Sequence, residues 1–258
     1  MREEKIISTT LAVIADIHGN RWALEAVLQD IDRRGIGQIV NLGDHLTGPL
    51  DPAGTADLLI GRHMVNVRGN DDRELFSLWE ELSPARQYTL QQLSPAHLDW
   101  LRTLPDTAVV GSDVFACHGD LFGTPYLLEQ VKTSGVRLRT TGEIEASVAD
   151  IPQPAILCGH SHLPHTVYLT PGGKLIVNPG SVGLPAYTMP ANPWEDPIPY
   201  EMESGSPHAR YALLSKRGSD WQVEHVQIPY DWEHAAEVAR RNQRSDWARW
   251  LATGRAYT

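Results

Sequence analysis

The stretch TTLAVIADIHGNRWALEAVLQDIDRRG (residues 9–35) decides the fold. Its first eight residues form an apolar run that ends in an acid, which is typical of a buried strand. From residue 20 apolar side chains recur at helical spacing and a glycine closes the segment, so we expect a helix over 20–35. The pairing then repeats: GQIVNLGD (37–44) predicts a second strand, DPAGTADLLIGR (51–62) a second helix and HMVNVRGN (63–70) a third strand. Alternating strands and helices predict a parallel sheet.

After this β-α-β beginning the pattern changes. Residues 73–105 are predicted to be helical, with Ser83 and Ser94, each followed by proline, at helix starts. The segment 107–120 predicts a hairpin that turns at Gly111, and further strands with glycine-containing turns follow it. We therefore expect a second, β-rich sheet that shares one core with the first.

The last third of the chain holds two more expected features. A proline-rich loop, residues 185–207, interrupts the strands, and helices close the chain. No repeat or clear linker divides the sequence. We expect a single domain over 1–258, with 231–258 as a C-terminal helical extension.

Composition limits the class of protein. The chain has 258 residues, a hydrophobic share of 41% and a net charge of −10, so a nucleic-acid coat or a membrane-surface binder is not expected. Cys117 and Cys158 each end an apolar run, as buried reduced thiols do. The start, MREEKIIS, does not resemble a signal peptide, and no apolar run approaches the ~18 residues of a membrane span. We expect a soluble, cytoplasmic protein.

Five predicted strands end in residues of the metal-ligand type, and a glycine adjoins each of them. Because strand ends of an α/β sheet converge on one edge, these side chains are expected to meet there. In CGHSH (158–162) two histidines stand two residues apart, so in extended backbone both point to one side. The candidate donors are Asp16, His18, Asp44, Asn70, His118, His160 and His162.

Seven donors are too many for one tetrahedral ion and suit two ions about 3.5–4 Å apart. Nitrogen and oxygen donors without thiolate favour manganese, iron, zinc, nickel or cobalt over calcium or magnesium. Taken singly, each donor has a structural alternative: Asp16 suits a helix N-cap, His118 a core histidine and Asn70 a turn. Five such strand ends in order favour the shared metal site.

These motifs resemble those of the calcineurin-like metallophosphoesterases, and most closely their small bacterial and archaeal phosphodiesterase branch. The family pattern of D-x-H, G-D, G-N-H-D or G-N-C-D, H-G and G-H-x-H is present as ADIHGN, NLGD, RGNDD, CHGD and CGHSH. VNPGSVGLP (177–185) is a further mark of the small branch. The resemblance covers about residues 9–215, and the final helices carry none of these motifs.

The resemblance implies a fold and a ligand assignment. The fold is a four-layer α/β/β/α sandwich of two mixed sheets flanked by helices. A first ion is expected on Asp16, His18 and His162, and a second on Asn70, His118 and His160, while Asp44 bridges the two. Manganese is the ion we expect first.

The expected activity is hydrolysis of a phosphodiester. Two divalent ions lower the pKa of a water between them, and the resulting hydroxide attacks phosphorus in line with the leaving oxygen. The expected substrate is a small phosphate ester such as a nucleotide, without a stable nucleic-acid complex. A phosphomonoesterase and a non-catalytic scaffold on the same fold stay as alternatives, and a homo-oligomer is compatible with the sequence.

Asp71 stands where much of the family has a histidine that protonates the leaving oxygen. It is our candidate catalytic residue, although an ordinary aspartate with a pKa near ~3.9 is ionised at neutral pH. Asp72 would raise the pKa of Asp71 and nearby metals would lower it. We expect the metals to dominate, so that Asp71 stays charged.

Residues beside the motifs have less specific roles. Asn20, Arg21 and Arg68 are candidate substrate-binding residues, although Asn20 also suits a helix N-cap and Arg68 a structural ion pair. His45 and His165 are either partners of the metal ligands or surface residues.

The long loop 186–210 carries Tyr187, Trp194 and Tyr200, which are able to stack on a base. A proline-rich loop of this kind is equally compatible with a dimer contact, and the sequence does not choose between these roles.

Overall fold

The computed structural model describes residues 10–257 except 79, 81, 120–125, 133–134, 171–172, 191–197 and 219. Trp194, which was predicted to be able to stack on a base, therefore lies outside the described residues. The first nine residues, whose sequence does not resemble a signal peptide, lie outside them as well. Within the described part, no helix combines the length and apolar character needed to cross a bilayer.

The N-terminal half builds most of the first sheet, whose strands follow the order β14-β13-β1-β2-β3. β1, β2 and β3 pair in parallel, and the late strands β13 and β14 add antiparallel partners at one side. The third strand is only two residues long, shorter than HMVNVRGN suggested. The bounds are Thr10–Ile14 for β1, Gln38–Asn41 for β2, Val65–Asn66 for β3, Ala209–Arg217 for β13 and Asp220–Ile228 for β14.

The second sheet also has five strands, in the order β4-β5-β8-β10-β9. Its middle strands β5, β8 and β10 are parallel, and β4 and β9 pair with them in the antiparallel sense. The hairpin predicted across Gly111 is the β4–β5 pair, and Gly111 turns the chain with a positive φ of 62°. The bounds are Thr107–Val110 for β4, Val114–Cys117 for β5, Ala155–Leu157 for β8, Pro164–Leu169 for β9 and Lys174–Pro179 for β10.

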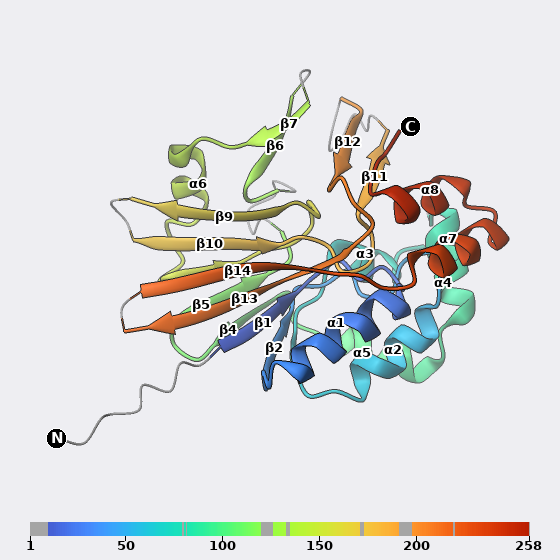
Figure 1. The fold of residues 1–258 in the computed structure, drawn as a ribbon, viewed down its shortest axis with the longest axis horizontal. Helices are drawn as coiled ribbons and strands as arrows, with labels where there is room; N and C mark the ends of the chain where they lie inside the picture. Colours follow the sequence, from blue (N-terminus) through green and yellow to red (C-terminus); the bar gives the residue numbers. More distant parts are fainter. Residues whose placement is uncertain are drawn as a thin grey trace.

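The two sheets pack face to face on an apolar core. Val13 and Val40 of the first sheet share this core with Ala116, Leu157 and Val177 of the second. The outer face of the first sheet is covered by α1, α2 and α5, and the outer face of the second by the short helix α6 (Figure 1). The predicted α/β/β/α sandwich of two mixed sheets is therefore confirmed, with one helical layer much thinner than the other.

The helices begin where the sequence indicated. Asn20 caps α1 by accepting a hydrogen bond from the Ala23 amide, and Ser83 and Ser94 cap α4 and α5, each ahead of a proline at the first helical position. The bounds are Arg21–Arg33 for α1, Pro52–Ile60 for α2, Asn70–Glu74 for α3, Pro84–Gln92 for α4, Pro95–Thr103 for α5, Thr141–Ser147 for α6, Trp232–Arg241 for α7 and Ser245–Thr253 for α8.

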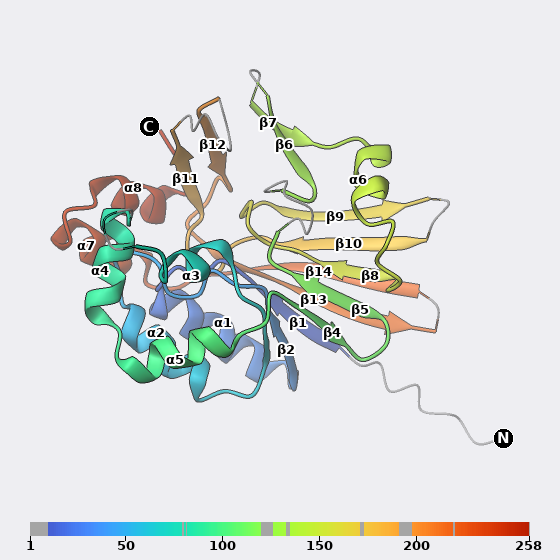
Figure 2. The same ribbon diagram turned by 180° about the vertical axis from the view of Figure 1, so that it is seen from behind.

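Two small antiparallel ladders stand outside the sheets (Figure 2). One joins β6 (Glu129–Lys132) to β7 (Gly135–Leu138), and the other joins β11 (Ala186–Met189) to β12 (Tyr200–Glu203). The prediction of a continuous loop over 185–207 was therefore wrong, because Tyr187 and Met202 form a cross-strand pair whose side chains are buried. This ladder packs with α7 and α8 in one apolar cluster.

Candidate metal centre

The structure brings all seven predicted donors to one edge of the two sheets. Asp16 and His18 follow β1, Asp44 follows β2, and Asn70 is the first residue of α3, the helix that follows β3. From the second sheet, His118 follows β5, and His160 and His162 follow β8. The strand ends converge as the sequence predicted, although they belong to two sheets rather than one.

Three of the donors form a first group. The Nε2 atoms of His18 and His162 lie 3.1 Å apart, and His162 Nε2 lies 3.4 Å from Asp16 Oδ1. All three side chains are buried. Their ligand atoms are close enough together to hold one ion.

The second group surrounds His118. Its Nε2 lies 3.0 Å from Asn70 Oδ1, 3.2 Å from His160 Nδ1 and 3.2 Å from Asp44 Oδ2. Asp44 Oδ2 also lies 3.9 Å from His18 Nε2, so its carboxylate stands between the two groups. This is the place that a bridging carboxylate requires.

Backbone carbonyl groups fix the orientation of three of the imidazole rings. Nδ1 of His18 contacts the Thr47 carbonyl oxygen at 3.0 Å, and the rings of His118 and His162 make the same contact at 2.8 Å with Leu42 and Leu184, respectively. A carbonyl oxygen only accepts, so each Nδ1 must carry a hydrogen and donate it. The unprotonated face of each neutral ring is then Nε2, the atom that points into the site.

The backbone at these donors is strained. Asp16, His18, Asp44, His160 and His162 have φ between 52° and 72°, and Gln243 is the only other described non-glycine residue with positive φ. Left-handed backbone is unfavourable for residues with a Cβ, and such strain persists mainly at functional sites. The tight turns aim the donors inward at the expense of stability.

Divalent cations fit this set of side chains. Asp16 Oδ1 is buried and has no hydrogen-bond partner among the described residues, which is costly for a carboxylate unless a cation faces it. The nitrogen and oxygen donors without thiolate suit a first-row transition metal such as Mn²⁺, Fe²⁺ or Zn²⁺. The residues present are therefore suited to hold divalent cations, and the assignment of individual residues to two ions stays a prediction.

The pKa shifts also indicate that this cluster of side chains favours a nearby positive charge. Burial alone would raise the pKa of Asp16 and Asp44, but neighbouring histidines hold the pKa of both carboxyls below the usual value. Burial opposes protonation of His118, yet Asp44 raises the pKa of this imidazole to about 9. Burial and the charge on His118 in turn lower the pKa of His160 to about 3. The carboxylates of Asp16 and Asp44 are thus stabilised by a positive charge on neighbouring histidines. A bound metal ion would supply that positive charge instead.

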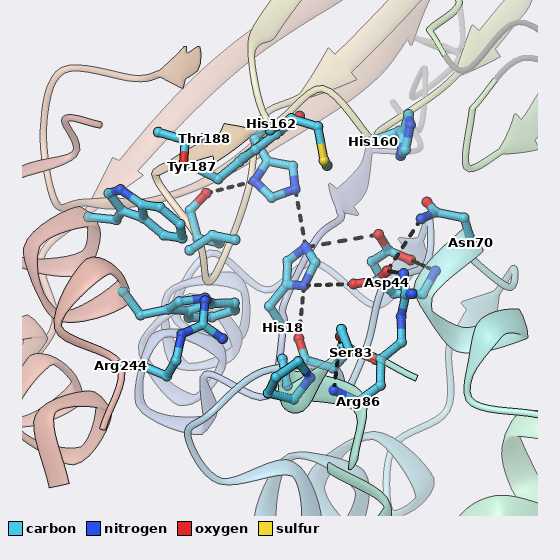
Figure 3. Close-up of a pocket in the computed structure, with 18 of the residues that line it drawn as sticks. His18, Asp44, Asn70, Ser83, Arg86, His160, His162, Tyr187, Thr188 and Arg244 are labelled. Atoms are coloured by element: carbon cyan, nitrogen blue, oxygen red, sulfur yellow. Dashed lines mark hydrogen bonds and ion pairs between the residues drawn. The ribbon is translucent and has the colours of Figure 1, made fainter. Parts of the chain in front are cut away.

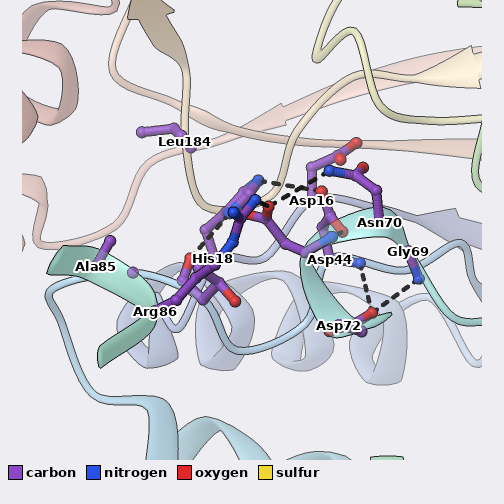
Figure 4. A network of polar contacts seen from close by, with 12 residues as sticks. Asp16, His18, Asp44, Gly69, Asn70, Asp72, Ala85, Arg86 and Leu184 are labelled. Carbon is purple, nitrogen blue, oxygen red and sulfur yellow. Dashed lines mark hydrogen bonds and ion pairs between the residues drawn. The ribbon is translucent and has the colours of Figure 1, made fainter. Parts of the chain in front are cut away.

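Asp72 ties two of the metal-binding turns together (Figure 4). Its buried carboxylate accepts hydrogen bonds from the backbone amides of Asp44 (2.9 Å), His45 (3.0 Å) and Gly69 (2.9 Å). Its Oδ2 also lies 2.7 Å from Nδ1 of His45, which is fully buried. His45 is therefore a partner of the turns that carry metal ligands and not a surface residue.

The motif VNPGSVGLP buttresses the first and last donors. Asn178 donates to the Gly159 carbonyl oxygen and to Ser161 Oγ, and Ser181 donates to the Asp16 carbonyl oxygen. Gly183 packs so closely on Ile17 that an added Cβ would lie 1.8 Å from the Ile17 carbonyl oxygen. This segment therefore holds the turns after β1 and β8 against each other.

A cavity of about 530 Å³ opens beside the donors (Figure 3). It is lined by five of them, all except Asp16 and His118. Asp71 also lines it, with Oδ2 3.7 Å from His18 Nδ1 and Oδ1 2.7 Å from Arg86 Nη2.

Burial and then the charge of Asp44 raise the pKa of Asp71, against the lowering effects of His18 and Arg86. The carboxylate that raises this pKa is therefore Asp44 rather than Asp72, which faces His45 instead. The expectation that bound metals keep Asp71 ionised stays a prediction.

The three predicted substrate-binding residues do not line this cavity. Asn20 is fully buried, caps α1 and donates to the Gly183 carbonyl oxygen and to the Tyr230 hydroxyl. Arg21 pairs with Glu25 and Asp51, and Arg68 pairs with Asp106. Their ordinary structural partners account for their positions, so direct substrate contact by these residues stays untested.

The remaining predicted residues divide between the cavity and its surroundings. Tyr187 lines the cavity, whereas Tyr200 is buried with its hydroxyl against that of Tyr126. His165 Nε2 lies 3.4 Å from a carboxylate oxygen of Glu129, outside the cavity lining. Both cysteines are buried thiols that form no disulfide, as the sequence indicated.

Several cavity residues were missed from the sequence. Arg86 comes from the first turn of α4, Arg244 precedes α8, and Trp247 and Trp250 lie on α8. No metal-binding motif marks these segments. The only available signal was the density of tryptophan in SDWARWLA (245–252).

Fold and site together define a metallophosphoesterase. Residues 10–192 match the model of the calcineurin-like phosphoesterase superfamily domain. The chain therefore belongs to this superfamily of phosphoesterases, which use divalent metal ions.

Individual relatives extend along nearly the whole chain. An uncharacterized protein of Methanocaldococcus jannaschii is 26% identical over 266 residues, which cover 94% of this chain and 96% of the relative. The crystal structure of a metallophosphoesterase from Sphaerobacter thermophilus aligns with a TM-score of 0.72 at 23% identity, covering 96% of this chain and all of that one. A putative diadenosine tetraphosphatase aligns with a TM-score of 0.53 at 19% identity, covering 87% of this chain and 96% of the other.

Proposed function

We propose that this protein is a metal-dependent phosphodiesterase that holds two divalent ions. The observation that carries the proposal is the convergence of imidazole Nε2 atoms and carboxylate oxygens, two of them 3.1 Å apart, at the edge of a cavity. When bound, two ions would lower the pKa of a water and neutralise the phosphoryl oxygens in the transition state.

In this proposal, some residues hold the ions and others orient the side chains that do so. Asp16, His18 and His162 would hold one ion, Asn70, His118 and His160 the other, and Asp44 both. Asp72 and the backbone carbonyls of Thr47, Leu42 and Leu184 fix the orientation of these side chains. The cavity beside them would receive the leaving group.

Charges near the cavity favour a diester over a monoester. Arg86 pairs with two carboxylates, Asp71 and Glu74, so this trio carries a net charge of about −1 when both acids are ionised. A singly charged diester is repelled less by that charge than a doubly charged monoester. Phosphomonoester hydrolysis is the second candidate, and the complete donor set argues against a purely non-catalytic scaffold.

The test compares bis(p-nitrophenyl) phosphate with p-nitrophenyl phosphate at saturating Mn²⁺. We expect hydrolysis of both esters to require the metal, and kcat/KM to be higher for the diester. His225→Ala provides a control, since His225 is an exposed residue of β14 outside the site. Faster turnover of the monoester would move the proposal to a phosphomonoesterase, and no metal-dependent hydrolysis of either ester would reject the enzymatic function.

A further inference from the structure

One side of the cavity, which adjoins His18 and His162, is largely apolar. Leu184, Tyr187, Met189, Trp247 and Trp250 line it, and we call these five residues the apolar wall. They come from the β11 region and from α8, which pack together in one cluster. The C-terminal helices, which carry no family motif, therefore form part of the same cavity as the metal donors.

The cavity lining also contains buried hydrogen-bond donors without partners. Thr47 Oγ1, Arg86 Nε and Trp250 Nε1 are buried atoms with no hydrogen-bond partner among the described residues. Thr47 and Trp250 are only 3% and 5% exposed. Buried polar groups are nearly always paired, so these three residues of the lining keep hydrogen-bonding capacity that the described chain does not satisfy.

Two arginines line the cavity and differ in their pairing. Arg86 is held between Asp71 and Glu74. Arg244 pairs with Asp246 through Nε at 2.9 Å and Nη2 at 2.6 Å, and within the described chain its Nη1 has no hydrogen-bond partner. The guanidinium also lies 5.6 Å from the centre of the Trp247 ring. Arg244 thus keeps donors for an anion beside an aromatic surface.

The position of Arg244 separates it from the metal donors. In Figure 3, Arg244 and Asn70 lie at opposite sides of the cavity, with His18 between them. A phosphoryl group at the donors would therefore not occupy Arg244 as well. A volume of about 530 Å³ is in the range of sites for small organic ligands and exceeds what one phosphate fills.

We propose that the cavity selects phosphate esters whose leaving group joins a flat apolar body to a second anionic group, the chemistry of a nucleotide. The apolar wall contacts the flat body, and Arg244 binds the second anion. This inference rests on the proposed function and specifies the substrate class of the same site.

The test measures binding to the Mn²⁺-loaded protein by quenching of tryptophan fluorescence. The probes are adenosine 3′,5′-bisphosphate, adenosine 5′-monophosphate and ribose 5-phosphate. We expect the bisphosphate to bind roughly 10-fold or more tightly than the monophosphate, because a charge-assisted hydrogen bond is added. The monophosphate should in turn bind more tightly than ribose 5-phosphate, since only the monophosphate carries the flat base.

Arg244→Gln should remove the preference for the bisphosphate, whereas Arg241→Gln, a charge-matched control on α7 outside the cavity, should retain it. Trp250→Phe keeps an aromatic ring but reduces the flat surface of the apolar wall, so it should weaken binding of both adenosine phosphates. Equal binding of bisphosphate and monophosphate by the wild type, or a preference that survives Arg244→Gln, would overturn the inference.

Failure of the inference and failure of the proposed function are distinguishable. Hydrolysis of bis(p-nitrophenyl) phosphate without a preference for the bisphosphate supports the function and rejects the substrate class. The expected binding pattern without hydrolysis of any diester supports the binding site and rejects the enzymatic function.

Discussion

His18 and His162, 144 positions apart in the sequence, place their Nε2 atoms 3.1 Å from each other. Each ring donates from Nδ1 to a backbone carbonyl, so in the neutral rings two lone pairs face each other. This contact is repulsive unless a proton or a metal ion lies between the rings. Folding of the chain therefore brings together two nitrogen atoms that are stabilised when a cation binds between them.

Asp44→Asn should reduce metal content and diesterase activity together. The substitution keeps the shape of the side chain but removes the charge that stands between the two donor groups. Metal analysis after gel filtration and Mn²⁺-dependent turnover provide the measurement. Asp113→Asn, in a partly exposed pair with Lys216, is the matched control. An Asp44→Asn protein with full metal content and wild-type turnover is incompatible with the two-ion assignment.

His160→Ala and His162→Ala should affect different ions. His162 contacts Asp16 and His18, whereas His160 contacts His118. Titration with a chelator should therefore remove the metals of the two variants in different order, and both variants should lose most of their activity. His225→Ala should behave as wild type. The assignment fails if the two variants show the same metal stoichiometry and normal activity.

Asp71→His should help poor leaving groups most. Asp71 lines the cavity and its carboxylate is held by Arg86, so in the wild type we expect no efficient proton donor and a steep dependence of rate on leaving-group pKa. A histidine there supplies general-acid help of roughly 10²-fold for the poorest leaving groups. Aryl phosphodiesters of graded phenol pKa provide the measurement.

Asp71→Asn is the control for this experiment, because it removes the charge without adding a proton donor. A flat dependence in the wild type would show that another group supplies the proton. His45 does not line the cavity and is fully buried against Asp72, so its position argues against that role.

Glu129→Gln should make stability less dependent on pH. Burial raises the pKa of Glu129 from 4.5 in the unfolded chain to about 7 in the fold. The native state therefore favours the neutral acid. Below pH 4.5 the carboxyl is protonated in both states, so the free energy of unfolding is unaffected. As the pH rises from 4.5 to about 7, ionisation in the unfolded chain lowers the free energy of unfolding, and above pH 7 the total loss is on the order of 3 kcal/mol.

The variant lacks this charge, so it should unfold at a higher temperature than wild type at pH 8 and at a similar temperature at pH 4. Calorimetry at both values provides the measurement. Glu237→Gln, on the partly exposed surface of α7 and paired with Arg240 and Arg241, should change either unfolding temperature only slightly, because surface ion pairs contribute little to stability. Glu129→Gln that is no more stable than wild type at pH 8 would show that the carboxyl ionises in the fold without penalty.

Most of the candidate metal-binding residues could be predicted from the sequence because each donor follows an apolar run. His118 directly follows β5, Asp16 stands two residues after the end of β1 and Asp44 three residues after the end of β2. Strand ends of an α/β sandwich must meet at an edge. Helix starts at Ser83 and Ser94 were readable for a similarly local reason, since a serine before a proline favours an N-cap. The sequence alone therefore predicted the fold class and the donor set, and both donor groups assemble in the structure.

Other features depend on contacts that no local pattern encodes. Residues 186–189 and 200–203 pair as strands within a segment whose prolines suggested a loop, because burial of Tyr187 and Met202 outweighs local preference. Arg86 and Arg244 reach one cavity only because α4 and α8 pack against the same edge of the molecule. The sequence by itself determined which residues are predicted to bind metal, because that prediction follows from short motifs at strand ends. Only the tertiary structure decided what surrounds the substrate, because those side chains meet through the packing of distant helices.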